Sequence, residues 1–191
     1  YEENSLSATL IKTDDSDVKW TGQVPAEITI EYPVESGVVK KIPVEVIDGA
    51  ALADTVKTVI TIPASVVNVV NTDEVQNGSN KIKEFRVDTD NESFTAEEGV
   101  LYRIINDEVV DYSTKWLWLY PNKKKDAQFD IPEDVDTINE LFNNPNLKKI
   151  GIGKKLELDE FNPFLQYGTD WNDDGEPIAY SIQLIIDGQN T

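Results

Sequence analysis

One stretch of this chain occurs twice, and that repetition constrains the fold more than any other feature. The first copy is Lys57–Val70, KTVITIPASVVNVV, and the second is Ala127–Asn139, AQFDIPEDVDTIN. A fixed internal period indicates an array of stacked structural units, and it outweighs local propensities. With Pro63 aligned on Pro132, 69 residues further on, four pairs of apolar positions coincide: Ile60 with Phe129, Ile62 with Ile131, Val66 with Val135, and Val69 with Ile138.

A second apolar segment follows each copy and extends the repeated unit. The segments are Asn80–Val87, NKIKEFRV, and Asn146–Ile152, NLKKIGI. The unit is therefore a short strand, a proline, two apolar steps, a turn and the next short strand. The matched positions in this part are Ile82 with Leu147, Phe85 with Ile150, and Val87 with Ile152.

The spacing of the strands gives the size of one unit. Ile62 lies 25 residues before Val87, and Ile131 lies 21 residues before Ile152. Leucine-rich repeats run about 20–29 residues per coil. One coil cannot bury its apolar side alone, whereas stacked coils bury a continuous core. The spacing therefore predicts a solenoid.

Three motifs resemble one known family. The patterns IxIPxxVxxI and NxLKxIxI are similar to the BspA-like leucine-rich repeats of bacterial cell-surface proteins. The stretch Phe85–Tyr102, FRVDTDNESFTAEEGVLY, followed by Leu117–Lys124, LWLYPNKK, resembles an insert common in that family. Gly37–Leu52, GVVKKIPVEVIDGAAL, is similar to its first coil. Together the motifs cover about residues 25–165, and their order makes the resemblance specific.

The resemblance implies a fold and a role. The expected fold is a right-handed leucine-rich-repeat solenoid, β-rich, with short parallel strands stacked in one sheet, brief helical turns and a β-hairpin insert. The expected role is non-enzymatic recognition or adhesion, in which the solenoid surface binds a protein of a host or of a neighbouring cell. The expected location is extracellular, at the bacterial cell surface, with any signal or anchor outside this chain.

We expect one domain over residues 1–191, in three parts. Residues 1–36 hold two alternating stretches, around Ala8 and Ile28, which predict an N-terminal cap hairpin. Residues 37–165 hold the divergent repeats, with the hairpin insert at about 88–125. Thr137–Asn143 is the best helix candidate, because Asn144-Pro145 stops it. Residues 166–191 hold a C-terminal strand, Ile178–Ile186, as a cap or as the start of a further coil.

Charge and composition exclude several function classes. The net charge of −19 argues against nucleic acid as a partner, because binding to phosphate needs clustered basic residues. The chain has no histidine and no cysteine. It therefore lacks the commonest general base, the commonest zinc ligands and any disulfide. No apolar run approaches the roughly 20 residues of a membrane-spanning helix.

Trp116, Trp118 and Tyr120 alternate with two leucines and are candidate ligand-binding residues. On a strand, alternate side chains share one face. An exposed aromatic face would stack on sugars or contact a protein, which makes a carbohydrate-binding or accessory module the alternative function. The competing interpretation is that this face packs onto the solenoid, since large aromatic side chains are usually buried in part. Trp171 is a further aromatic residue for the sugar-binding alternative.

Asp170–Gly175, DWNDDG, matches the first half of an EF-hand calcium loop. Asp170, Asn172 and Asp174 would supply oxygen ligands at alternate positions, and glycine at the sixth position permits the sharp turn. The twelfth position is Ser181, where a bidentate glutamate is expected. The alternative is a plain turn before the final strand. Calcium is thus a candidate ligand, and no other cofactor is expected.

A cluster of five acidic residues lies between Asp88 and Glu98. Two carboxylates at a fixed separation in a cleft would be needed for glycan hydrolysis. The alternative is an Asp-Asn turn of the family's insert, and we therefore expect no catalytic residue.

Overall fold

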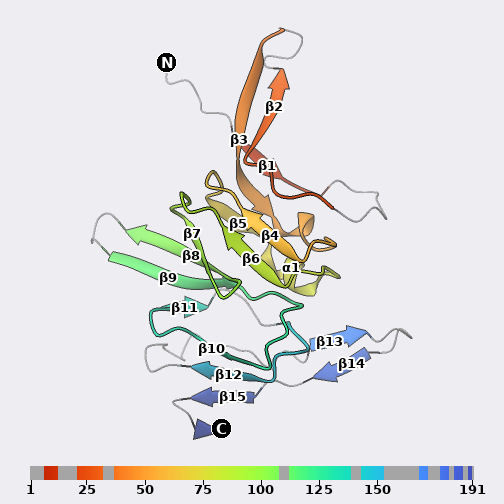
Figure 1. Cartoon of the computed structure of the whole chain (residues 1–191), viewed down its shortest axis with the longest axis vertical. Helices are drawn as coiled ribbons and strands as arrows, with labels where there is room; N and C mark the ends of the chain where they lie inside the picture. Colours follow the sequence, from red (N-terminus) through yellow and green to blue (C-terminus); the bar gives the residue numbers. More distant parts are fainter. Residues whose placement is uncertain are drawn as a thin grey trace.

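The structure is a computed structural model that describes residues 7–12, 21–31, 37–107, 112–138, 143–152, 168–171, 177–180, 183–186 and 189–190. The chain forms an elongated stack of β-coils, with an N-terminal hairpin projecting at one end and the last strands at the other (Figure 1). It is the β-solenoid that the repeats predict.

The two repeat copies form equivalent pairs of parallel strands. Strand β4 (Val59–Ile62) pairs with β6 (Glu84–Val87), and Ile60 lies opposite Phe85. Strand β10 (Gln128–Asp130) pairs with β12 (Lys149–Ile152), and Phe129 lies opposite Ile150. These are the same matches that the sequence alignment made, so the repeat is confirmed at the level of strand register.

A second column of parallel strands lines the other side of the coils. After each proline the chain turns, with Val66 N donating to Pro63 O and Val135 N donating to Pro132 O. Proline suits the point where a coil leaves the sheet, because it has no N–H for a ladder. Strand β5 (Asn68–Val70) then pairs with β3 (Val39–Asp48), as β11 (Thr137–Ile138) pairs with β9 (Tyr112–Leu119).

The helix prediction for Thr137–Asn143 is wrong at its first two residues. Thr137 and Ile138 form β11, and residues 139–142 lie outside the described part of the chain. Pairing with β9 overrides the local helical pattern here. In the described part of the chain, helical turns lie just after the first copy and before it: α1 spans Thr72–Asn77, and the 3₁₀ turn η1 spans Gly49–Ala51.

The strands of the expected cap hairpin do not pair with each other. Strand β1 (Ala8–Leu10) runs parallel to β3, and β2 (Glu27–Glu31) runs antiparallel to the outer half of β3. The projecting hairpin in Figure 1 is therefore β2–β3. Strand β3 is long enough to pair with both β1 and β2, one at each end.

The insert lies inside the stack. Strands β7 (Phe94–Glu97), β8 (Val100–Asp107) and β9 form an antiparallel meander between the two repeat copies (Figure 1). The parallel strands on the first side of the coils consequently form two sheets, β4–β6 and β10–β12–β15, where one sheet was expected.

The C-terminal segment contains more strands than expected. The stretch Ile178–Ile186 forms parts of β14 (Pro177–Tyr180) and β15 (Gln183–Ile186). Strand β14 pairs antiparallel with β13 (Gly168–Trp171), and β15 pairs in parallel with β12 and antiparallel with β16 (Gln189–Asn190). Because β15 extends the parallel sheet, this part of the chain continues the coil stack.

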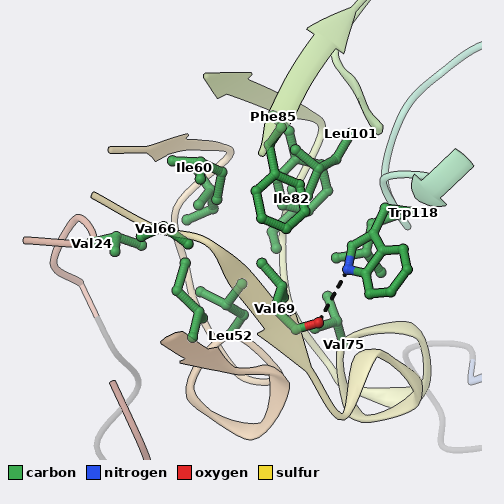
Figure 2. Close-up of a cluster of buried hydrophobic side chains, with 14 of the residues drawn as sticks. Val24, Leu52, Ile60, Val66, Val69, Val75, Ile82, Phe85, Leu101 and Trp118 are labelled. Atoms are coloured by element: carbon green, nitrogen blue, oxygen red, sulfur yellow. Dashed lines mark hydrogen bonds between the residues drawn. The ribbon is translucent and has the colours of Figure 1, made fainter. Parts of the chain in front are cut away.

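Two apolar clusters fill the stack, one on each side of the meander. The first gathers aliphatic side chains of the first repeat copy with Phe85, Phe94 and Trp118. Figure 2 shows Phe85 and Trp118 among the aliphatic side chains of this cluster. The second gathers those of the second copy with Tyr102 and Tyr120. The coils of both repeat copies thus bury their apolar side chains against their neighbours, as stacking of coils requires.

A column of buried amide side chains supports one corner of the coils. Gln76, Asn80, Asn122 and Asn144 are all at most 4% exposed. Their side-chain nitrogens donate to main-chain carbonyls of their own or neighbouring coils, including Tyr120 O, Val75 O, Gln76 O and Pro121 O. Turns that would otherwise bury unpaired carbonyls are satisfied in this way.

Within the described residues, no helix is both long enough and apolar enough to cross a membrane.

Candidate functional site

The parallel sheets present one polar face along the stack. On β4, β6, β10 and β12, buried residues alternate with more exposed ones, as the two-residue period of a strand requires. The inward residues Ile60, Phe85, Phe129 and Ile150 are at most 5% exposed. The outward residues are Thr61 on β4, Arg86 on β6, Gln128 and Asp130 on β10, and Lys149 on β12.

A hollow interrupts this face where the β4–β6 ladder ends. The β7–β8 turn occupies the next position, and Phe85 N donates to Gly99 O at 2.8 Å. Glu98 and Gly99 both have positive φ, 50° and 80°, a conformation that glycine tolerates best. The hollow has a volume of about 520 Å³, and its charged lining residues are Lys83, Glu84, Arg86, Glu98 and Lys124.

Two ion pairs lie among the charges around the hollow. Arg86 Nε lies 2.6 Å from Glu84 Oε1, and this bond and the nearby charge raise the pKa of Arg86. Lys124 Nζ lies 2.7 Å from Asp126 Oδ2. An exposed pair such as Arg86–Glu84 contributes little to stability, because solvent screens it. The mixed signs of the charges around the hollow make the surface suited to polar contacts with another macromolecule.

Of the three aromatic candidates, two lie in the core. Trp118 is 7% exposed, and its Nε1 donates to Val69 O at 3.1 Å (Figure 2). Tyr120 is 1% exposed and packs on Phe129, with a centroid distance of 5.0 Å. Trp116 is partly buried, 6.4 Å from the ring of Trp118. The packing interpretation therefore holds for Trp118 and Tyr120.

The alternation predicted that the three aromatic side chains share one face of the strand, and this prediction is wrong. Leu101 lies opposite Leu119, whereas Tyr102 lies opposite Leu117, so Trp118 is an extra residue in β9. A β-bulge of this kind reverses the side on which the following residues point. Leu117 consequently packs in the second cluster and Leu119 in the first.

Lys115 is a buried charged residue that the sequence analysis did not identify. It is 8% exposed, and its Nζ lies 2.5 Å from Glu97 Oε1 and 3.0 Å from Asp134 Oδ2. The same Nζ lies 4.5 Å from the centroid of the Tyr102 ring. Lys115 thus ties the meander to the proline turn of the second copy. Its position in an alternating strand gives no sequence signal for this role.

The acidic segment forms a turn. Asp88 Oδ1 accepts from Asp90 N, and Asn91 Oδ1 accepts from Ser93 N and Phe94 N. Asn91 Nδ2 donates to the carbonyls of Pro63 and Val66 at 2.7 and 2.9 Å. The amide of Asn91 therefore joins the segment to the preceding coil, as the interpretation of this stretch as a turn predicted.

The calcium candidate is only partly described. Asp170 and Trp171 lie in β13, which pairs with β14. Asn172 and Asp174 lie outside the described residues. No cluster of three or more acidic side chains arranged for a metal occurs in the described part of the chain. Calcium binding at the Asp170–Gly175 turn therefore stays a prediction.

Solved structures similar to this chain come from bacteria. No family model matches the chain, and no curated protein matches it. A leucine-rich cell-surface protein from Faecalibacterium prausnitzii A2-165 is 24% identical with a TM-score of 0.44, over 59% of this chain and 28% of that one. The pneumococcal vaccine antigen PcpA is 27% identical with a TM-score of 0.46, over 60% and 26%. A leucine-rich-repeat protein from Eubacterium ventriosum ATCC 27560 is 18% identical with a TM-score of 0.41, over 59% and 34%.

The match thus spans about a quarter to a third of each of these chains. The parallel register of the coils, and not these likenesses, establishes the fold.

Proposed function

We propose that this chain is part of a non-enzymatic recognition scaffold at the surface of a bacterium, and that it binds a protein partner through the outer face of its sheets. The observation that carries the proposal is the exposed polar face described above, with its hollow at the β7–β8 turn. A stacked array holds such a face rigid over several coils, which suits contact with a macromolecule. The cell-surface description of a similar protein supports the location.

The outward residues differ from coil to coil, and this supports specific recognition. Thr61, Arg86 and Asp130 occupy equivalent places on β4, β6 and β10, yet their side chains are neutral, positive and negative. A partner whose charges complement this order along the stack would bind in preference to one whose charges do not. Because several coils share the contact, each single substitution is expected to have a partial effect.

The sugar-binding alternative has little support from the burial of its residues. Trp118 and Tyr120 are packed, so stacking on a sugar would depend on Trp116. A partner that bound in this way would lose its affinity on Trp116→Ala.

A binding screen against host matrix proteins, bacterial surface proteins and polysaccharides, with and without calcium, tests the proposal. Arg86→Ala is expected to weaken a protein hit about three- to tenfold, the loss of a charged contact at an interface rim. Lys41→Ala is the matched control, because Lys41 is also exposed and paired, 2.5 Å from Glu27, on the projecting hairpin.

Two results would contradict the proposal. One is a protein hit that Lys41→Ala weakens as much as Arg86→Ala does. The other is a panel whose hits are polysaccharides that depend on Trp116. A hit that requires calcium and is lost on Asp170→Asn would direct attention to the turn at the C-terminal hairpin instead.

A further inference from the structure

Lysines gather on one flank of this acidic chain. The protein has 17 Lys and Arg against 36 Asp and Glu. A random distribution would surround most cations with carboxylates. Instead, four lysines line a single hollow of about 560 Å³: Lys81, Lys83, Lys123 and Lys125. Its other lining residues are Val56, Thr58 and Asn146, so none of the described residues that line it is acidic.

These lysines come from successive coils that lie side by side. Lys81 N donates to Thr55 O and Lys83 N donates to Thr58 O, which places residues 81–83 next to 55–58. Lys123 N donates to Ile82 O at 2.9 Å, which adds the next segment. Asn146 Nδ2 donates to Lys124 O at 3.0 Å and adds a fourth. The lysines therefore follow the direction in which the coils stack.

The segments under the lysines are held firmly. Asn80 is fully buried, and its side chain donates to Val75 O and accepts from Ile82 N. Ile82 lies between the two lysines of this coil, Lys81 and Lys83. Asn144, also fully buried, donates to Pro121 O and to Lys124 O. The buried amide column thus fixes the backbone from which the lysines project. Pre-organised charges bind a ligand with less ordering cost than charges on a loose loop.

The exposed lysines are available to a ligand. Lys81, Lys83 and Lys125 are exposed, and within the described part of the chain none of them is in a salt bridge. Val56, 39% exposed, gives the hollow an apolar patch against which lysine stems can lie. The ammonium groups then stay in water at the rim.

We propose that this flank binds a linear polysaccharide that carries repeated anionic groups. A line of cations along the coils complements a line of anions along a polymer. Lysine offers compact point charges, which select for charge density and not for one planar group. The acidic remainder of the surface repels the polymer elsewhere and so confines it to the flank.

Nucleic acid is the less favoured polyanion. Proteins that hold single strands combine a basic groove with aromatic side chains that stack on bases. The described residues that line this hollow include no aromatic side chain. A polysaccharide needs no stacking and fits the observed lining.

Heparin serves as the probe in a titration of the intact chain at low salt, with uncharged dextran as the blank. The double variant Lys83→Gln/Lys125→Gln is expected to lower heparin affinity about thirtyfold, since one lysine near an anionic surface is worth about a factor of five. The control double variant Lys40→Gln/Lys41→Gln makes the same change in net charge on β3, and its affinity should stay within about twofold of the parent. All four side chains are exposed, so both variants should melt like the parent.

The outcomes separate clearly. Selective loss in the flank variant, with binding that weakens as salt rises, supports the proposal. Equal loss in the two double variants would mean a diffuse charge effect and would overturn it. The absence of heparin binding by the parent chain would also overturn it, as would tighter binding of a single-stranded oligonucleotide than of heparin.

Discussion

Replacing Trp118 tests whether the meander is a structural member of the core. Removing a buried Trp side chain to alanine costs about 3–5 kcal/mol. Trp118 meets the conditions for the upper part of that range, because it is 7% exposed and packs edge-on against Phe94 at 6.4 Å. Its Nε1–H also satisfies Val69 O on β5, and a buried carbonyl left unpaired costs about 1–3 kcal/mol. We therefore expect Trp118→Ala to lose about 4–5 kcal/mol of unfolding free energy.

Urea denaturation followed by far-ultraviolet circular dichroism measures the loss as a fall in midpoint at constant slope. Trp118→Phe is the milder variant, should alanine prevent folding, and its expected cost is about 1–3 kcal/mol because the indole hydrogen bond is lost. Trp116→Ala is the matched control on the same strand, and as a partly buried residue it should cost less than half as much as Trp118→Ala. A cost below about 1 kcal/mol for Trp118→Ala would refute the packing argument.

Three further predictions concern the coil corners and the buried tyrosines. Gly78→Ala would place a Cβ 2.2 Å from the main-chain oxygen of Ala53, so we expect a loss of about 2–3 kcal/mol in urea denaturation; an unchanged midpoint would contradict the close approach of these coils. Asn144→Leu removes the donor to two main-chain carbonyls and should lower stability by about 2–4 kcal/mol. Asn144→Asp keeps the volume of the side chain but also removes this donor. Burial raises the pKa of both Tyr102 and Tyr120 above the ordinary value near 10. The folded state therefore favours the neutral phenols, and the contribution of these two tyrosines to stability should be constant below about pH 10 and fall above it. Melting temperatures measured between neutral pH and about pH 11 should fall less steeply in Tyr102→Phe than in the parent.

The register of the coils could be predicted from the sequence, and the corners could not. Aligning Pro63 with Pro132 was sufficient to identify Ile60 and Phe129 as equivalent inward residues, since each coil repeats the same burial problem. Helix and strand at the corners depend on neighbours that differ between coils. Thr137 pairs with Trp116 on β9, and this tertiary contact overrides a weak helical propensity.

The candidate surfaces were harder to predict than the fold. Lys123–Lys125 reads as a solvated turn in a single sequence, because nothing shows that Lys81 and Lys83 lie in the adjacent coil. In the folded chain the hydrogen bond from Lys123 N to Ile82 O places the two segments side by side. Function on a solenoid arises from residues far apart in the sequence, so a pattern within one segment cannot reveal it.

The burial of the aromatic residues follows from the two roles of β9. This strand runs antiparallel to β8 in the meander and parallel to β11 in the coil stack, so it takes the place that β3 takes beside β5. A strand with apolar clusters on both sides needs apolar residues at consecutive positions, and not in alternation. The run from Trp116 to Tyr120, WLWLY, is such a sequence. Its continuity, more than the alternation of aromatic and leucine residues within it, was the signal that the insert completes the core of both halves.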